Sequence, residues 1–183
     1  MPDIRKTTLF DIDAILKKIN LEERQQVAEL GCGNSGFFVF PLAQLVGQRG
    51  RVYAVDILKT TLEEIRREAV KRNLPQILPV WSNLEIFKAT AIETSSLDDV
   101  LLINTLHQSE KKIEILREAI RLLKRGGKLL IVEWKHADSP FGPAPERRVK
   151  VDSLKMAAPK IGLNIKEEFD AGPYHYGLVL IKL

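Results

Sequence analysis

The sequence predicts an α/β domain: a three-layer sandwich whose mostly parallel, seven-stranded sheet ends in a C-terminal antiparallel hairpin. Short apolar runs alternate with stretches of helical periodicity along most of the 183 residues, the pattern of parallel strands joined by helices. A glycine-rich turn follows the first apolar run, and a carboxylate ends the second. The last two runs are joined by residues 171–173, too short a link for a parallel crossover, so they must form a hairpin.

The strands are predicted from apolar runs bounded by turn residues. The run at 99–104 is apolar almost throughout, as in a strand that is covered on both faces. In chain order, the predicted strands span 27–30, 51–55, 77–81, 99–104, 128–133, 164–169 and 174–182.

The helices are predicted from apolar stripes at helical spacing. They span 10–19, 37–46, from Thr60 or Thr61 to Arg72, from Ser109 or Glu110 to Lys124, and 149–161. Pro41 lies in the first turns of its helix, where a missing N–H is tolerated. Thr60 or Thr61 is expected to cap the third helix. Residues 137–146 contain three prolines and a glycine, so they are expected to form a loop.

Composition and charge limit the classes of function. A length of 183 residues predicts one domain over residues 1–183. No apolar run approaches the ~20 residues of a membrane span, and the N-terminus lacks an apolar signal core, so a cytoplasmic location is expected. Basic pairs such as Arg147-Arg148 are dispersed without interleaved aromatics, and most are expected to be solvated. The net charge of +4 is mild. A nucleic-acid substrate is therefore unsupported, although a pI of about 9.2 leaves it open.

Metal and thiol chemistry are not expected. The three histidines, at 107, 136 and 175, are widely spread, so no metal-ligand cluster is visible. Cys32 is the only cysteine, which excludes an internal disulfide. It lies inside the glycine turn, where a small residue is wanted, and no neighbouring base marks it as a nucleophile.

The glycine turn predicts a site for a nucleoside cofactor. Gly31, Gly33 and Gly36 have G-x-G-x-x-G spacing, and Asp56 follows 20 residues after the last glycine. This layout fits a nicotinamide dinucleotide or S-adenosylmethionine. Glu29 stands two residues before the turn, where a carboxylate would repel a pyrophosphate but would suit the ammonium group of S-adenosylmethionine. The chemistry therefore favours S-adenosylmethionine.

The order of these motifs resembles that of class I S-adenosylmethionine-dependent methyltransferases. The segments that carry the resemblance are 29–36 (Glu-Leu-Gly-Cys-Gly-Asn-Ser-Gly), Val55-Asp56, 104–107 (Asn-Thr-Leu-His), 123–127 (Leu-Lys-Arg-Gly-Gly) and 175–179 (His-Tyr-Gly-Leu-Val). Within that superfamily the chain resembles the group of the ubiquinone/menaquinone-biosynthesis C-methyltransferases. The resemblance covers about residues 10–183. It implies a Rossmann-like fold and S-adenosylmethionine as the cofactor.

The resemblance also implies a set of cofactor-binding residues: Glu29, Gly31, Cys32, Gly33, Asp56, Ile57, Asn83, Leu84 and Asn104. Glu29 would meet the methionine ammonium group, and the glycine turn would let backbone approach the methionine portion. Asp56 would take the ribose hydroxyls, and Ile57 would pack on adenine. Asn83 stands at the position where an acid of the family commonly accepts a hydrogen bond from the adenine amino group. Glu85 is the competing candidate for this contact, and Asn83 could instead be an ordinary turn residue.

Methyl transfer places few demands on catalytic residues, because the sulfonium carbon is already activated and the protein mainly aligns the acceptor. A general base is needed only if the acceptor keeps its proton. His107 is the first candidate and Glu133 the second. Trp134 and His136, beside the proline-rich loop, are candidates for the acceptor wall.

Two other functions stay open at this point. One is a non-catalytic cofactor-binding or assembly subunit, and the less favoured one is an NAD-dependent oxidoreductase. A small-molecule acceptor is expected, without excluding nucleic acid or protein. About 26 residues precede the first strand, so residues 1–20, the 137–148 loop or a second copy of the chain must cover the acceptor, unless the site is open.

Overall fold

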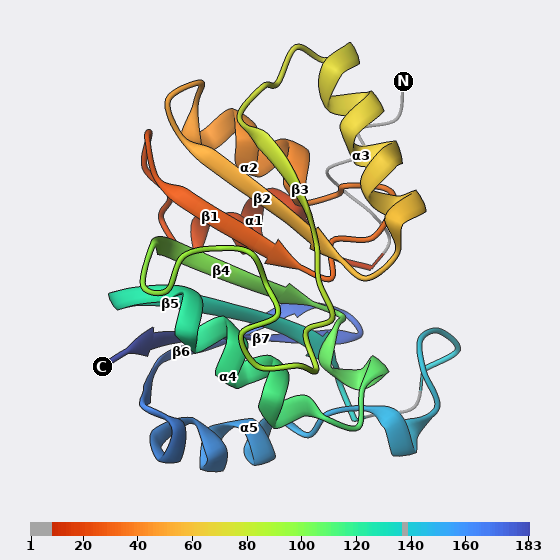
Figure 1. The fold of residues 1–183 in the computed structure, drawn as a ribbon. Helices are drawn as coiled ribbons and strands as arrows, with labels where there is room; N and C mark the ends of the chain where they lie inside the picture. The colour runs from red at the N-terminus through yellow and green to blue at the C-terminus, as the bar shows by residue number, and fades with distance from the viewer. Residues whose placement is uncertain (1–8, 137–138) are drawn as a thin grey trace.

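A computed structural model describes residues 9–136 and 139–183 (Figure 1). A seven-stranded sheet runs through it in the order β3-β2-β1-β4-β5-β7-β6. The strands are β1 (Gln26–Leu30), β2 (Arg51–Asp56), β3 (Ile77–Trp81), β4 (Leu97–Ile103), β5 (Leu123–Trp134), β6 (Leu163–Gly172) and β7 (His175–Lys182). β7 lies between β5 and β6 and is antiparallel to both, while β1 to β5 pair in parallel. The predicted fold class is confirmed.

Helices cover both faces of the sheet. They are α1 (Ile12–Lys17), α2 (Val39–Val46), α3 (Lys59–Lys71), α4 (Lys112–Leu122) and α5 (Val151–Ala157), with short 3-10 helices η1 (Leu106–Gln108), η2 (Pro145–Arg147) and η3 (Ala158–Ile161). One core contains α1, α2 and α3, and the other contains α4 and α5. Successive strand residues enter opposite cores, as Val27 and Ala28 do, because side chains alternate across a sheet.

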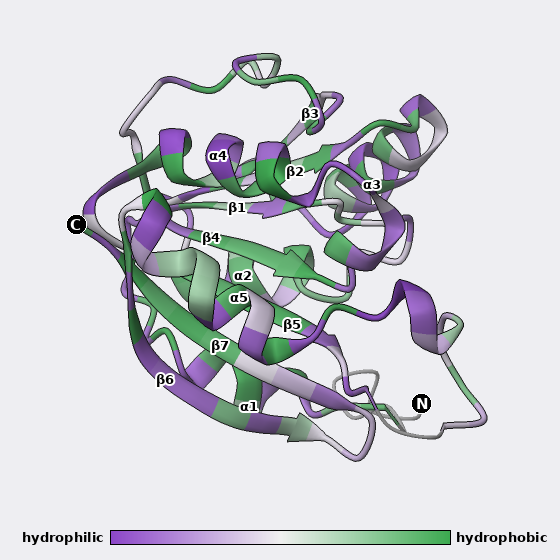
Figure 2. Cartoon of the chain, turned by 90° about the horizontal axis from the view of Figure 1, so that it is seen from below, coloured by the Kyte–Doolittle hydropathy of each residue, from purple (hydrophilic) through white to green (hydrophobic). Residues whose placement is uncertain are grey.

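Hydropathy follows these layers. In Figure 2 β4 and β7 are mostly apolar, whereas the edge strand β6 carries polar segments. Residues of β6 alternate between greater and lesser burial along most of its length, as expected for a strand with one solvated face. Among the described residues, none of the helices has the length and apolar character that crossing a membrane requires.

Several predicted boundaries were wrong for tertiary reasons. Helix α3 is not capped by Thr60 or Thr61; its N-cap is Leu58, whose N–H donates to Asp56 Oδ1 at 2.9 Å. Helix α4 begins at Lys112, later than expected, because η1 and the turn after it intervene. It also ends earlier, at Leu122, and β5 starts directly at Leu123, which pairs with Leu97 of β4.

The C-terminal elements also differ in extent from the prediction. The expected helix over 149–161 divides into α5 and η3. Pro159 lies in the first turn of η3, where it cannot donate the hydrogen bond that would continue an α-helix. Strand β6 extends to Gly172, so only Pro173 and Tyr174 remain between the hairpin strands.

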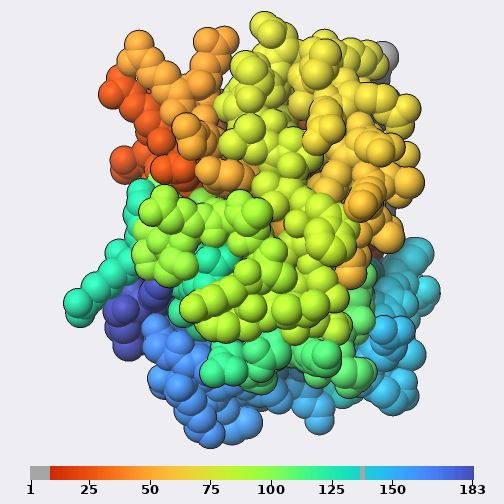
Figure 3. Space-filling view, viewed as in Figure 1, coloured from red at the N-terminus to blue at the C-terminus, as the bar shows by residue number. Residues whose placement is uncertain are grey.

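The strand order places the candidate site. The order reverses between β1 and β4, and ligands of open α/β sheets bind at such a switch point, beyond the carboxyl ends of the strands. The segment that follows β3, yellow-green in Figure 3, lies between the yellow α3 and the green α4. It is held to α4 by Glu118, which accepts the Lys88 and Thr90 N–H groups at 2.8 and 3.0 Å.

Candidate functional site

A cleft of about 620 Å³ opens at the switch point. Six of the predicted cofactor-binding residues line it: Gly31, Gly33, Asp56, Ile57, Asn83 and Leu84. Glu29 and Cys32 are buried and are not among the lining residues, and Asn104 lines a neighbouring cavity. The structure therefore brings the predicted residues to one end of the sheet but in two layers, a lining and a buried floor.

The glycine turn is fixed to the adjacent strand and to the turn after β4. The N–H groups of Gly31 and Cys32 both donate to Val55 O, at 2.8 and 3.1 Å. Gly31 has φ +79°, and a Cβ there would lie 2.8 Å from the Thr105 side chain, so only glycine fits. Burial and the nearby Glu29 carboxylate raise the pKa of the Cys32 thiol, which keeps it protonated and unsuited to nucleophilic attack.

Asp56 ends β2 with its carboxylate at the cleft. Its Oδ2 accepts the Gly33 N–H at 3.1 Å, and its Oδ1 accepts the Leu58 N–H at 2.9 Å. These bonds fix the side chain between the glycine turn and α3. Since each carboxylate oxygen can accept two hydrogen bonds, both oxygens retain a position for a ligand hydroxyl.

Glu29 is a buried acid, 3% exposed, at the end of β1. Burial raises its pKa well above the usual value; the Val39 N–H partly offsets this, and the Asp56 carboxylate raises it further. Among the described residues, neither Glu29 Oε2 nor the buried Asn104 Oδ1 has a hydrogen-bond partner. An unsatisfied buried acceptor costs about 1–3 kcal/mol. Two such acceptors fit a cofactor that carries an ammonium group.

The other end of the cleft is formed by the segment after β3. Asn83 Oδ1 accepts a hydrogen bond from the Glu85 N–H at 3.0 Å. The Asn83 side chain thus closes a turn over residues 83–85. Glu85 Oε1 accepts a hydrogen bond from Ser109 Oγ at 2.6 Å, and Ser109 lies in the turn between η1 and α4. Ile57 is 52% exposed, and its carbonyl accepts the Trp81 indole N–H at 2.8 Å. This end therefore offers an apolar edge and a polar turn.

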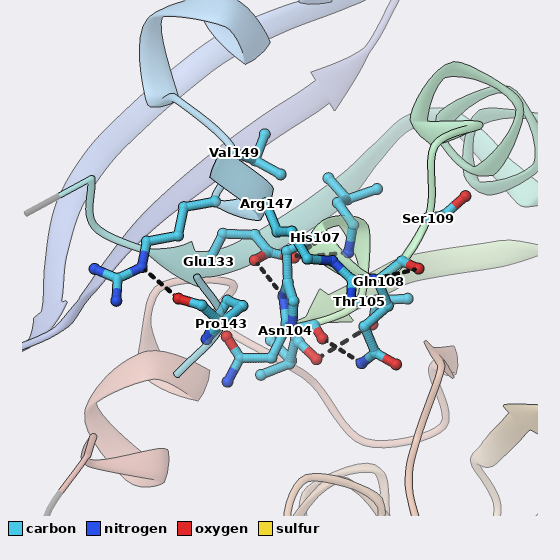
Figure 4. Close-up of polar contacts among 12 residues, drawn as sticks. Asn104, Thr105, His107, Gln108, Ser109, Glu133, Pro143, Arg147 and Val149 are labelled. Atoms are coloured by element: carbon cyan, nitrogen blue, oxygen red, sulfur yellow. Dashed lines mark hydrogen bonds and ion pairs between the residues drawn. The ribbon is translucent and has the colours of Figure 1, made fainter. Parts of the chain in front are cut away.

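His107 and Glu133 form a pair, drawn in Figure 4. His107 Nδ1 lies 2.9 Å from Glu133 Oε2. Glu133 is fully buried, and its Oε1 accepts the Leu106 N–H at 2.6 Å and the His107 N–H at 3.3 Å. Glu133 was expected as an alternative base; its burial and these contacts place it beneath His107, where it orients the imidazole and leaves Nε2 for another partner.

A second cavity, of about 550 Å³, adjoins the cleft. Its lining residues are Asn104, His107, Gln108, Trp134, Gly142, Pro143 and Arg147. Gln108 lines the cleft as well, so the two spaces are neighbours. Of the two candidates for the acceptor wall, Trp134 lines this cavity, whereas His136 is not among its lining residues.

The proline-rich loop forms one side of this cavity. Gly142, at φ +87°, lies against the Trp134 ring so closely that a Cβ would come within 2.5 Å of Cε3. Arg148 is 7% exposed, and its guanidinium donates to Pro143 O at 3.0 Å and to Lys135 O and Phe141 O at 3.2 Å. Residues 1–8 and 137–138, which belong to the two segments expected to cover the acceptor, lie outside the described residues.

Arg148 is an exception to the expectation that most of the basic pairs are solvated, because its side chain is buried. It satisfies loop carbonyls that the sequence does not associate with it. The adjacent Arg147 is exposed and lines the cavity. The only sequence feature that marks Arg147 is its place in the basic pair, which does not predict a position in a site. Gln108 and Gly142 were also missed, because neither belongs to a recognised motif.

Arg148→Met is expected to release the loop, because at least three hydrogen bonds to carbonyls are lost, each contributing about 1 kcal/mol. Backbone amides of residues 139–147 should then exchange at least about tenfold faster in hydrogen–deuterium exchange. Arg147→Met is the matched control and should leave this exchange unchanged. Equal protection of the loop in both variants would contradict the anchoring role of Arg148.

The fold and the cleft define a Rossmann-like domain that binds a nucleoside cofactor at its switch point. A family model described as a methyltransferase domain matches residues 21–168. The chain belongs to this family, that of the class I S-adenosylmethionine-dependent methyltransferases. The resemblance to this family and the cofactor that it implies, S-adenosylmethionine, are both confirmed.

Individual relatives are distant. The chain is 29% identical over 175 residues to the S-adenosyl-L-methionine-dependent Diels-Alderase iccD of Talaromyces variabilis, covering 90% of this chain and 58% of the relative. It is 28% identical over 183 residues to the ubiquinone/menaquinone biosynthesis C-methyltransferase UbiE of Sinorhizobium fredii, covering 96% and 66%. A solved S-adenosylmethionine-dependent methyltransferase from Aquifex aeolicus superposes with a TM-score of 0.88 at 23% identity, covering 99% and 94%. The chain thus spans about three fifths to two thirds of these two curated relatives.

Proposed function

We propose that the chain transfers a methyl group from S-adenosylmethionine to a small-molecule acceptor. The observation that carries the proposal is Glu29, a buried carboxylate whose Oε2 lacks a partner among the described residues. A pyrophosphate over the glycine turn would be repelled by this acid, whereas an ammonium group would satisfy it. In the proposed complex Glu29 and Asn104 hold the ammonium group, and Asp56 holds the ribose hydroxyls.

The remaining cofactor contacts follow from the cleft. Ile57 and Leu84 would enclose the adenine. The second lone pair of the Asn83 side-chain oxygen would accept a hydrogen bond from the adenine amino group. Gly31, Cys32 and Gly33 would admit the methionine portion close to backbone. These assignments use the lining residues of the cleft and the buried floor below it.

The chemistry needs alignment more than activation. When bound, S-adenosylmethionine supplies a methyl carbon activated by positively charged sulfur. The cavity beside the cleft would hold the acceptor in line with that carbon and exclude water from it. His107 Nε2 would accept the proton of an acceptor that keeps one, and Glu133 would stabilise the resulting imidazolium through Nδ1.

His107→Gln is expected to lower kcat for such an acceptor about 10²- to 10⁴-fold, the usual contribution of a general base. Glu133→Gln should lower kcat less, because it keeps a side chain near Nδ1 but removes the charge. The affinity for S-adenosylhomocysteine should stay unchanged in both variants. The rates are measured as transfer of labelled methyl groups; unchanged rates in both variants would exclude a base role for His107.

The proposed function is tested by calorimetric titration of the pure protein. Binding of S-adenosylmethionine and S-adenosylhomocysteine, without binding of NAD, is the expected result. NAD binding in their place would support an oxidoreductase. Labelled S-adenosylmethionine is then incubated with the protein and a small-molecule extract, and methylated products are sought by chromatography.

A second candidate is a cofactor-dependent cyclisation without methyl transfer. Its support is the similarity to a relative named as a Diels-Alderase. This function predicts that S-adenosylmethionine binds but is not consumed, so that no S-adenosylhomocysteine accumulates during turnover. Arsenite is a weaker candidate acceptor, because Cys32 is the only cysteine and is buried.

A further inference from the structure

The cavity beside the cleft has a lining that is rich in donors and contains no carboxylate among its lining residues. Its volume, about 550 Å³, falls in the range of small-molecule sites. Glu133, which contacts the lining residue His107, is buried and engaged with that side chain and with two backbone N–H groups. The electrostatic character of the cavity is therefore set by its one formally cationic lining residue, Arg147.

Arg147 carries a charge that no acid balances among the described residues. The hydrogen bond that it makes within the described part of the chain, from Nη2 to Gln108 O, is 3.4 Å long, at the weak end of hydrogen-bond distances. The side chain is exposed and lines the cavity together with His107 and Gln108 (Figure 4). Since a guanidinium has five N–H donors, most of them have no partner among residues 9–136 and 139–183 and can donate to a ligand.

Trp134 provides an aromatic part of the cavity wall. Its ring lies against His175, with centroids 4.1 Å apart, and Gly142 also packs against it. The side chain is 7% exposed, so these neighbours hold it in place. Trp134 therefore offers a fixed aromatic surface on which the apolar part of an acceptor can pack.

We propose that this cavity selects an acceptor that carries a carboxylate, which is bound by Arg147 while the rest of the acceptor packs against Trp134. The inference rests on the proposed function, because it names the class of acceptor for the same site. A single arginine matches the single charge of a carboxylate bidentately, whereas a phosphate dianion would keep excess charge. The carboxylate would hold the acceptor with another part of it beside His107 Nε2.

The test uses 2-naphthoate and its neutral isostere 2-naphthamide, titrated by calorimetry into the protein with and without saturating S-adenosylhomocysteine. The expected result is at least about tenfold tighter binding of the naphthoate, as for a charge-assisted pair. 2-Naphthyl phosphate should bind more weakly than the naphthoate. Arg147→Gln should abolish the preference for the anion and leave binding of the amide unchanged.

Arg125→Gln is the matched control, because Arg125 is also exposed but lies near the opposite, N-terminal end of the parallel part of β5. It should leave naphthoate binding unchanged. Equal affinity for naphthoate and naphthamide, equal losses in both variants, or no naphthoate binding at millimolar concentration would overturn the inference. Tighter binding of the phosphate would overturn the choice of a carboxylate. Failure of S-adenosylhomocysteine to bind would instead count against the proposed function.

Discussion

Replacing Glu29 by glutamine is expected to lower the affinity for S-adenosylmethionine at least about 30-fold, because truncating one partner of a buried charge pair costs about 2–5 kcal/mol. Affinity for 5′-methylthioadenosine should not change, since that ligand has the same nucleoside but no ammonium group. Calorimetric titration of both ligands measures the difference. Glu29 is suited to this test because the variant keeps the size of a side chain that is 3% exposed.

Asp56→Asn is the companion variant, and it should weaken both ligands in parallel because both contain the ribose. The two variants thus separate the ends of the cofactor. A parallel loss of both ligands in Glu29→Gln would show that Glu29 supports the glycine turn rather than the ammonium group. Unchanged binding of S-adenosylmethionine would remove Glu29 from the site.

The raised pKa of Glu29 gives the same interaction a pH dependence. Below that pKa the free protein holds a proton that the ammonium group must displace, so affinity should rise as pH increases through it. Binding should release protons, seen as a binding enthalpy that varies with the ionisation enthalpy of the buffer. In Glu29→Gln this contribution to proton release should vanish.

His175 is expected to make the free energy of unfolding fall steeply in acid. It is fully buried, between the rings of Trp134 and Phe10, and burial lowers its pKa to about 4. The Leu9 backbone partly offsets this, while the charges of His107 and Lys135 lower the pKa further.

The sign follows from the two states. The unfolded chain takes up a proton at His175 near pH 6.5, whereas the folded chain does so only near pH 4. Stability from this residue is therefore complete above about pH 6.5 and is lost as pH falls toward 4. The loss amounts to about 3 kcal/mol, at 1.36 kcal/mol for each pH unit.

His175→Phe should reduce this acid-dependent loss by about 3 kcal/mol, because phenylalanine suits the same aromatic surroundings and does not titrate. Urea unfolding at a series of pH values measures it. His136→Phe is the control, since His136 is exposed and should leave the pH dependence unaltered. Parallel curves for wild type and His175→Phe would show that His175 does not drive the loss.

The sequence was sufficient for features whose physical cause is local. The apolar runs located all seven strands, and the short link before β7 indicated its antiparallel direction, because three residues cannot form a crossover. The glycine spacing and Asp56 located the cleft for a similar reason: they lie in one βαβ unit. Strand order and direction then brought the remaining segments to that edge.

Features that depend on distant partners were not predictable. The sequence indicates His107 and Glu133 as two separate candidates. Nothing in it predicts that these residues, 26 positions apart, form a hydrogen-bonded pair. The N-cap of α3 could not be predicted from the helix sequence alone. The N-cap is Leu58, and its N–H donates to the carboxylate of Asp56, which belongs to the preceding strand. The burial of Arg148 is not predictable from its basic pair, because its partners are backbone carbonyls that only the folded chain brings to it.

The two tryptophans of the chain lie at different ends of this arrangement. Trp81 is 51% exposed beside Ile57, at the nucleoside end, and Trp134 lines the second cavity. The protein therefore carries two intrinsic fluorophores, one beside each of the two proposed ligand sites. In Trp134→Phe the emission of Trp81 would respond to arrival of the nucleoside, and in Trp81→Phe the emission of Trp134 would respond to the acceptor. Stopped-flow recordings of the two variants would give the order in which the ligands enter, without any attached label.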